Sequence, residues 1–154
     1  MMLDDLLSPD RVVAGLRARR KHALLAELAR RAASAAGLGG AAILSALVKR
    51  EALGSTGVGA GVALPHARFA GLARPFGLLA TLRAPIDYEA VDDGPVDLVC
   101  LLLLPTEAQG AHRNALACAA RRLRDPQVAN ALRACRDAQG LYAVACAAGA
   151  LTRA

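Results

Sequence analysis

A run of seven consecutive apolar residues, Leu98 to Leu104, constrains the fold of this chain more than any other feature. The run is closed by Pro105, and the segment that contains it begins at Val96. A strand that is apolar on both faces has to be covered on both faces, which is typical of a sheet that lies between layers of helices. We therefore expect residues 96–104 to form a central strand.

Two shorter apolar segments predict further strands. The first runs from Val62 to Leu64 and is ended by Pro65, and the second runs from Phe76 to Leu82. Both lie between the glycine-rich middle of the chain and the central strand. The strands of the sheet are therefore expected in the middle third of the sequence.

The segments on either side of these strands have helical patterns. From Lys21 to Ala35, apolar residues recur on one face and charged residues on the other, as in an amphipathic helix. Asp125 followed by Pro126 is a typical helix start. Further helices are expected at residues 41–52, 112–123 and 137–147. Helices, then strands, then helices again imply an α/β fold in which a mixed β-sheet is sandwiched by helices.

Length and composition favour one globular unit. The chain has 154 residues, the usual size of a single domain, so we expect residues 1–154 to form one domain. It is 55% hydrophobic but only 3% aromatic, so its core has to be built from Ala, Leu and Val. This composition excludes a disordered chain.

The net charge of +6 raises the question of a nucleic-acid partner. The basic residues are mostly arginines scattered at helical spacing, and the chain has few aromatic side chains on which bases could stack. The whole supply is Phe69, Phe76, Tyr88 and Tyr142. We interpret the charge as an arginine-rich solvated surface and expect no nucleic-acid partner.

Cysteine usage and the N-terminus predict a cytoplasmic protein. The four cysteines, Cys100, Cys118, Cys135 and Cys146, form no C-x-x-C pair, so we expect free, buried thiols in a reducing compartment and no metal site. The N-terminus is acidic and lacks the basic and apolar regions of an export signal. The uncharged stretch from Ala32 to Val48 is interrupted by glycines, which predicts a turn between two helices rather than membrane insertion.

The most unusual segment is glycine-rich, with four glycines in the eight residues from Gly54 to Gly61. We expect a loop of high backbone freedom. No lysine follows the glycines as a P-loop requires, and their spacing does not fit G-x-G-x-x-G at the start of a helix. The loop instead offers backbone N–H groups and the hydroxyls of Ser55 and Thr56, and it leads to Pro65 and His66.

Two histidines are candidates for chemistry. His66 follows a predicted strand end and a proline, just beyond a loop that can offer hydrogen-bond donors to an anion. His112 begins the helix after another strand, so both imidazoles are placed to reach one crevice of the sheet. A neutral imidazole is a nucleophile for phosphoryl transfer, and donors around it stabilise the transferred charge.

With these motifs in order, the sequence resembles the EIIA domains of the fructose and mannitol class of bacterial phosphotransferase systems, including their nitrogen-regulatory branch. The resemblance covers about Lys21 to Ala147 and rests on several motifs in the same order. They are Arg50-Glu51, Gly54-Ser55-Thr56-Gly57-Val58-Gly59, Val62-Ala63-Leu64-Pro65-His66, Ala84-Pro85-Ile86, Pro95-Val96-Asp97-Leu98 and a helix led by His112.

The resemblance implies a role for each matching residue. His66 would accept a phosphoryl group from a phosphorylated HPr-like carrier, NPr or HPr. His112 would be a second active-site imidazole that donates a hydrogen bond to the phosphoryl group, and Arg50 would supply a fixed positive charge. Neither a metal nor an organic cofactor is implied.

The glycine-rich loop would pack around the same site. Ser55, Thr56 and Gly57 are then candidates for direct contact with the phosphoryl group. The segment from Phe69 to Pro75, which follows the site, differs in detail from the family pattern, so the rim that a partner protein meets is expected to differ as well.

The resemblance leaves three functions open. The first is a regulatory phosphocarrier that controls target proteins in nitrogen or other metabolism. The second is a sugar-transport EIIA that passes phosphate to an EIIB cysteine during fructose-like or mannitol-like uptake. The third, from another class, is a binding module without phosphotransfer, against which the retention of His66 and His112 speaks.

Individual residues also have simpler explanations. His112 is alternatively a helix-start residue with a structural hydrogen bond. Arg50 and Glu51 are alternatively a surface ion pair of little energetic value. The sequence leaves open which ring nitrogen of His66 is phosphorylated.

Overall fold

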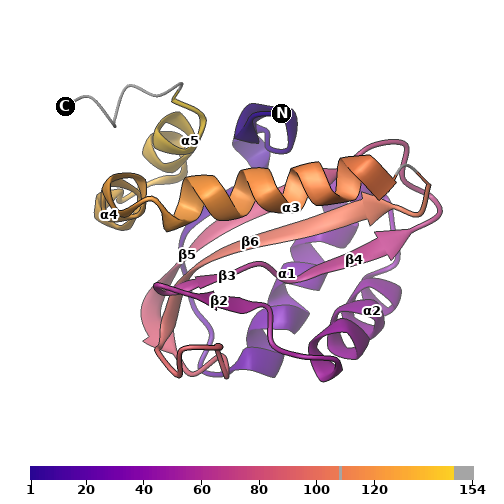
Figure 1. Cartoon of the computed structure of the whole chain (residues 1–154), viewed down its shortest axis with the longest axis horizontal. Helices are drawn as coiled ribbons and strands as arrows, with labels where there is room; N and C mark the ends of the chain where they lie inside the picture. The colour runs from indigo at the N-terminus through magenta and orange to yellow at the C-terminus, as the bar shows by residue number, and fades with distance from the viewer. Residues whose placement is uncertain (108, 148–154) are drawn as a thin grey trace.

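The computed structural model describes residues 1–107 and 109–147, except for the side chains of residues 109, 111 and 112. Figure 1 shows one sheet with α3 crossing its front face and α1 behind it. The described helices are α1 Lys21–Ala36, α2 Gly40–Ala52, α3 Gln109–Arg124, α4 Pro126–Ala134 and α5 Ala138–Cys146, preceded by the 3₁₀ turns η1 Leu3–Asp5 and η2 Pro9–Arg11. The predicted α/β fold with a mixed sheet between helices is confirmed.

The sheet has six strands in the described part of the chain. They are β1 Val12–Leu16, β2 Gly57–Gly59, β3 Val62–Ala63, β4 His66–Phe69, β5 Phe76–Ile86 and β6 Val96–Pro105. The order is β1-β5-β6-β3-β2, and β4 also pairs with β6. β6 runs antiparallel to β5 and parallel to both β3 and β4, so the sheet is mixed.

Strand β6 divides two hydrophobic cores. Val99, Leu101 and Leu103 pack into the core that contains the buried faces of α1 and α2. Leu98, Cys100, Leu102 and Leu104 pack into the core under α3, α4 and α5. Successive side chains of a strand point to opposite faces, so an uninterrupted apolar run serves both layers. The predicted central strand is therefore confirmed.

Strands β3 and β4 share one edge of β6 and are separated by a short break. Val62 pairs with Leu98, and His66 pairs with Leu102, while the N–H of Leu102 donates to the carbonyl of Pro65 at 2.9 Å. The break spans Leu64 and Pro65. His66 is therefore the first residue of a strand that holds it against the central strand.

The structure differs from the sequence predictions at the short strands. β1, β2 and β4 were not predicted, and the loop expected to be irregular contains β2. These strands have three to five residues, and a segment so short gains its strand conformation from its neighbour in the sheet rather than from its own pattern. β5 is longer than predicted, because it continues past Leu82 through three exposed residues to the buried Ile86.

Most helix boundaries agree with the local signals, but α3 begins at Gln109, three residues before the start expected at residue 112. α1 and α2 each begin or end within one residue of the predicted limits. The Asp125 side chain accepts a hydrogen bond from the N–H of Gln127 at 3.0 Å, and Asp137 accepts one from the N–H of Gly140 at 2.8 Å. Both aspartates therefore act as N-caps, as Asp125 was predicted to do.

All four cysteines are free, as expected, but only Cys100 and Cys118 are buried. Cys135, which follows α4, and Cys146, the last residue of α5, are half-buried, so the expectation that all four are buried is wrong for these two. Helix faces next to the solvent admit partly exposed apolar residues. In the described residues, no helix combines the length and hydropathy needed to cross a membrane.

Candidate functional site

His66 is held by hydrogen bonds at both ring nitrogens. Its Nδ1 lies 2.8 Å from the carbonyl oxygen of Leu64, and its Nε2 lies 3.3 Å from Nε of Arg50. A carbonyl oxygen only accepts hydrogen bonds, so Nδ1 carries the proton and donates it to Leu64. The lone pair of Nε2 then accepts the hydrogen bond from Arg50. This is the neutral tautomer whose free nucleophilic atom is Nε2.

The surroundings keep the ring neutral. Burial lowers the pKa of His66, and the positive charges of Arg50 and Arg68 lower it further, while the carbonyl of Leu64 and the carboxylate of Glu51 act in the opposite direction. The net effect is a lowered pKa. A histidine with this shift is unprotonated at neutral pH, as a nucleophile has to be.

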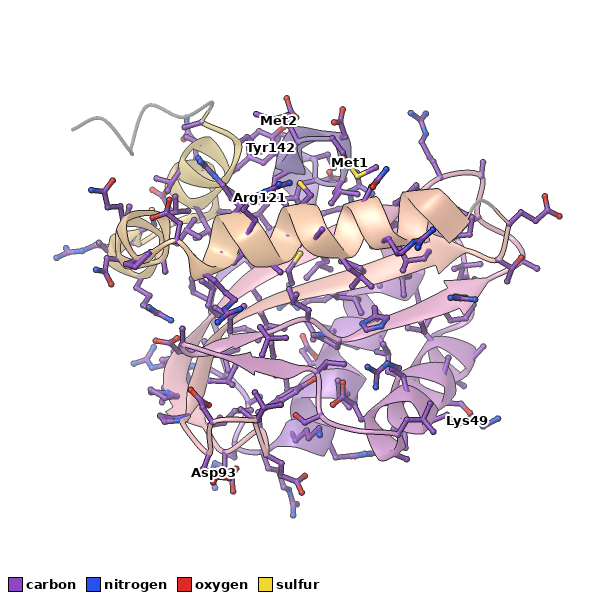
Figure 2. All side chains as sticks on the ribbon, viewed as in Figure 1. Met1, Met2, Lys49, Asp93, Arg121 and Tyr142 are labelled. Carbon is purple, nitrogen blue, oxygen red and sulfur yellow. The ribbon has the colours of Figure 1, made fainter. Side chains whose placement is uncertain are left out.

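A pocket of about 450 Å³ opens beside the imidazole. Its lining comes from the end of α2, from β4 and β6 and from α3, and consists of Ala46, Lys49, Arg50, Leu53, His66, Ala67, Arg68, Leu104 and Leu116. Three of these side chains are cationic, and no described lining residue is acidic. Figure 2 shows Lys49 projecting outward from α2. The pocket therefore has the charge and size to receive a small anionic group such as a phosphoryl group.

Arg50 lies in the last turn of α2 and bridges the loop and the histidine. Its Nε donates to Nε2 of His66, and its Nη1 donates to the carbonyl of Gly54 at 2.9 Å. Two donors on the planar guanidinium therefore fix its position. Because the side chain reaches His66, the structure brings together the two predicted residues Arg50 and His66.

Glu51, the neighbour of Arg50, points away from the pocket. Its side chain is only 6% exposed and forms an ion pair with Lys21 at 3.0 Å. The alternative of a surface ion pair between Arg50 and Glu51 is therefore wrong. Adjacent residues of a helix lie about 100° apart around its axis, so two neighbours serve different faces.

The three loop candidates make their hydrogen bonds inside the protein. Thr56 is 2% exposed, and its N–H and hydroxyl both bind the carboxylate of Glu51. The Ser55 hydroxyl donates to the carbonyl of Tyr88 at 3.3 Å and accepts from the N–H of Gly57 at 3.1 Å. None of the three lines the pocket beside His66. Their direct contact with a phosphoryl group stays a prediction.

Gly57 has a packing role in addition. A Cβ atom at this position would lie 2.7 Å from Cβ of Ala90 and 3.1 Å from the ring of Tyr88. The N–H of Val91 donates to the carbonyl of Gly57 at 3.0 Å. Only glycine allows the loop to approach the segment of residues 88–91 so closely.

His112 lies in the first turn of α3, and its side chain is outside the described part of the structure. Leu116, one helical turn later, lines the pocket of His66. Among the side chains that are described, no group of three or more His, Cys, Asp or Glu residues could hold a metal ion.

The sequence analysis missed two features of the site. Lys21 and Tyr88 bind Glu51 from positions far away in the chain. Arg68 follows His66 by two residues and lines the same pocket. The alternation of a strand places residues 66 and 68 on one face, so predicting β4 would have revealed Arg68.

Comparison with known proteins defines the class. A model of the family described as phosphoenolpyruvate-dependent sugar phosphotransferase system, EIIA 2, matches residues 5–145. The chain therefore belongs to this family. The predicted resemblance is confirmed.

Within the family, the chain is similar to nitrogen regulatory proteins. The nitrogen regulatory protein of Bradyrhizobium diazoefficiens is 46% identical over 144 residues, which cover 94% of each chain. That of Pseudomonas aeruginosa is 35% identical over 143 residues, or 92% of this chain and 93% of its own. The crystal structure of nitrogen regulatory protein IIA-Ntr from Neisseria meningitidis has a TM-score of 0.86 and 30% identity, and the match covers 92% of this chain and 97% of that one.

Proposed function

We propose that this chain is a phosphocarrier of a bacterial phosphotransferase system that takes up a phosphoryl group on Nε2 of His66. The observation that carries the proposal is a neutral imidazole with Nε2 facing Arg50 in a pocket lined by three cations. The family of the chain supports it, because EIIA proteins belong to the phosphoenolpyruvate-dependent sugar phosphotransferase system. As a carrier it forms a phosphohistidine and then passes the phosphoryl group to the next protein.

The transfer step follows from the tautomer. The lone pair of Nε2 attacks the phosphorus of a phosphohistidine on the donor protein. A bond between phosphorus and Nε2 forms as the bond between phosphorus and the donor nitrogen breaks, and the electron pair returns to the donor ring. The proton on Nδ1 stays in its hydrogen bond to Leu64, which stabilises the positive charge that develops on the ring.

Arg50 serves before and after the transfer. Its N–H faces the lone pair of Nε2 in the unphosphorylated protein, so it has to move aside as the phosphoryl group arrives. The guanidinium then lies beside the phosphoryl oxygens, and Arg68 adds a second charge from the pocket wall. Charge-assisted hydrogen bonds of this kind are the strong ones for phosphate.

His112 is proposed as a donor to the same phosphoryl group. Residues four apart on a helix share a face, and Leu116 lines the pocket. This spacing supports the proposal that position 112 is on the pocket side of α3. Ser55, Thr56 and Gly57 come second as direct contacts, because their polar groups already bind partners in the protein.

The proposed donor is an HPr-like carrier, NPr or HPr, and the protein acts in the cytoplasm as a single regulatory EIIA unit. Leu53 is 84% exposed at the edge of the pocket and offers an apolar contact to a docking protein. The names of the relatives favour control of target proteins over sugar transport. The alternative is sugar transport, in which His66 passes the phosphoryl group to an EIIB cysteine. An experiment distinguishes this alternative from the regulatory function.

The test is labelling from phosphoenolpyruvate with the general enzyme of the system and each carrier. Wild-type protein should gain acid-labile, base-stable phosphate, His66→Ala should gain none, and the exposed His22→Ala should behave as wild type. Labelling of His66→Ala at the wild-type level would rule out the site, and no labelling of wild type with any carrier would rule out the function. Onward transfer to an EIIB would support the transport alternative.

A further inference from the structure

A group of largely buried polar side chains, two of which border an open surface pocket, lies behind Arg50. It consists of Lys21, Glu51, Thr56 and Tyr88, which we call the Glu51 cluster. The Glu51 carboxylate accepts hydrogen bonds from the N–H of Thr56 at 3.0 Å, from the Thr56 hydroxyl and from the Tyr88 hydroxyl at 3.1 Å. Lys21 completes the set with an ion pair at 3.0 Å.

The cluster joins four separate segments of the chain. Lys21 begins α1, Glu51 lies near the end of α2, Thr56 belongs to the glycine-rich loop, and Tyr88 follows β5. Tyr88 and Thr56 are essentially inaccessible to solvent, and the ammonium of Lys21 stands 4.7 Å from the centre of the Tyr88 ring. Burial raises the pKa of Tyr88, and the charge of Glu51 raises it further, so the hydroxyl keeps its proton and donates it.

The geometry of residues 50–56 connects this cluster to the reacting histidine. Glu51 holds Thr56 through two hydrogen bonds, so the backbone between them forms a short closed loop. Gly54 lies inside that loop, and its carbonyl accepts the second hydrogen bond of Arg50. The other donor of Arg50 points at Nε2 of His66. The position of the Gly54 carbonyl therefore helps to decide where the guanidinium stands.

We propose that Glu51 is a positioning residue of the phosphoryl site, whose carboxylate fixes the Gly54 carbonyl and thereby directs Arg50 at His66. Glu51 forms no hydrogen bond with His66 and does not line its pocket, so apart from the effect of its charge on the pKa of His66 it acts through Arg50. A buried carboxylate that serves several donors is costly to disturb, because each donor loses its partner when it leaves. The kinetic consequence rests on the proposed phosphocarrier function, whereas the arrangement of Arg50 does not.

The first experiment compares Glu51→Gln with wild type in phosphoryl uptake from a phosphorylated HPr-like carrier. A displaced guanidinium should lower kcat by about 10- to 100-fold, while KM for the carrier changes less than about twofold. Glu27→Gln is the matched control, because Glu27 also pairs with two basic side chains, Arg30 and Arg31, but on the outer face of α1. A wild-type kcat in folded Glu51→Gln would overturn the proposal.

The second experiment observes Arg50 without phosphorylation. In wild type, the Nε–H signal of Arg50 in NMR spectra should be protected from exchange with water by its bond to His66. In Glu51→Gln this protection should be lost, and in Glu27→Gln it should remain. A protected Arg50 signal in folded Glu51→Gln would show that Glu51 does not direct the guanidinium.

The pKa of His66 separates positioning from a direct charge effect. The carboxylate of Glu51 raises this pKa, so loss of its charge alone would lower it. Arg50 lowers the pKa, and its effect is larger than that of Glu51, so release of the guanidinium would raise it. We expect a raised pKa of His66 in Glu51→Gln. A lowered or unchanged pKa would contradict the positioning role.

A second variant keeps the proposal testable if Glu51→Gln does not fold. Tyr88→Phe removes one donor from the carboxylate and leaves the ring in place. It should show the same three changes to a smaller extent: a kcat lowered about two- to fivefold, a less protected Nε–H of Arg50 and a raised pKa of His66. Wild-type values for all three in folded Tyr88→Phe would then overturn the proposal. If wild-type protein takes up no phosphate, the proposed function fails, and the NMR measurements still decide the role of Glu51.

Discussion

The two sides of Arg50 differ in charge and in how completely their polar groups are paired. On one side is the His66 pocket, which is open and lined by Lys49, Arg50 and Arg68 without a described acidic residue. On the other side is the Glu51 cluster, in which the carboxylate is matched by Lys21 and both side chains border an open surface pocket, while Thr56 and Tyr88 are buried. An excess of positive charge suits a site that receives an anion, whereas a buried support has to be neutralised and fully hydrogen-bonded. Residues on the first side should affect transfer, and those on the second should affect stability as well.

Arg50→Ala should give the largest effect. We expect phosphoryl uptake by His66 to slow by about 100- to 1,000-fold, because a positioned charge is lost from the transition state. The free energy of unfolding should change by less than about 0.5 kcal/mol, since the side chain is only half-buried. Rapid-quench labelling and urea unfolding measure the two quantities. The control is Lys49→Ala, at the neighbouring exposed position. An equal loss of uptake rate in Lys49→Ala would mean that the total positive charge of the pocket matters and the position of the Arg50 guanidinium does not.

Thr56→Val should lower stability, which Arg50→Ala leaves nearly unchanged. The change removes a hydroxyl that binds Glu51 and lies 3.0 Å from the Tyr88 hydroxyl in a site that water does not reach. We expect a loss of about 1–3 kcal/mol in the free energy of unfolding, because buried polar partners are left unsatisfied. Urea unfolding measures it, with the half-buried Ser55→Ala as control. Wild-type stability of Thr56→Val would contradict a structural role for the cluster.

Leu53→Ser tests the rim of the pocket. The side chain is 84% exposed, so stability should not change, while KM for the donor protein should rise by about fivefold if Leu53 contacts it. Val91 is 71% exposed and does not line the pocket, so Val91→Ser serves as control. Equal KM values for the two variants would remove Leu53 from the proposed docking surface.

The smallest effect concerns pH. Because the folded protein lowers the pKa of His66, the unfolded chain binds this proton more readily, with a pKa of about 6.5. The contribution of the neutral ring to stability is complete above that pH and is lost as the pH falls toward the lowered pKa of the folded state. Wild-type protein should therefore lose stability between pH 7 and pH 5 more steeply than His66→Gln. Parallel urea-unfolding curves across this range would contradict the lowered pKa.

The predictability of the fold depended on the length of each element. The run from Leu98 to Leu104 predicted β6 because it serves two cores at once. The four residues of β4 did not predict a strand, because only their pairing with β6 makes them one. Pro65 predicts the end of a strand, and for that reason the return of the chain to the sheet at His66 was not predicted.

The predictability of the site depended on distance along the chain. His66 and Arg50 were identified from motifs, and the structure joins them by a hydrogen bond of 3.3 Å. Thr56 was also identified, as a candidate phosphate contact; that role stays a prediction, and in the structure its hydroxyl binds Glu51. A loop sequence shows which donors exist and does not show where they point.

The amino-acid sequence by itself determined the α/β class and the central strand, and it singled out His66 as the candidate for phosphorylation, because these follow from local patterns and from a motif read in order. Only the tertiary structure decided which nitrogen of His66 is free, since that depends on the carbonyl of Leu64 and the guanidinium of Arg50. It also decided that Glu51 belongs to a buried cluster, because Lys21 and Tyr88 reach it only after four distant segments have packed together.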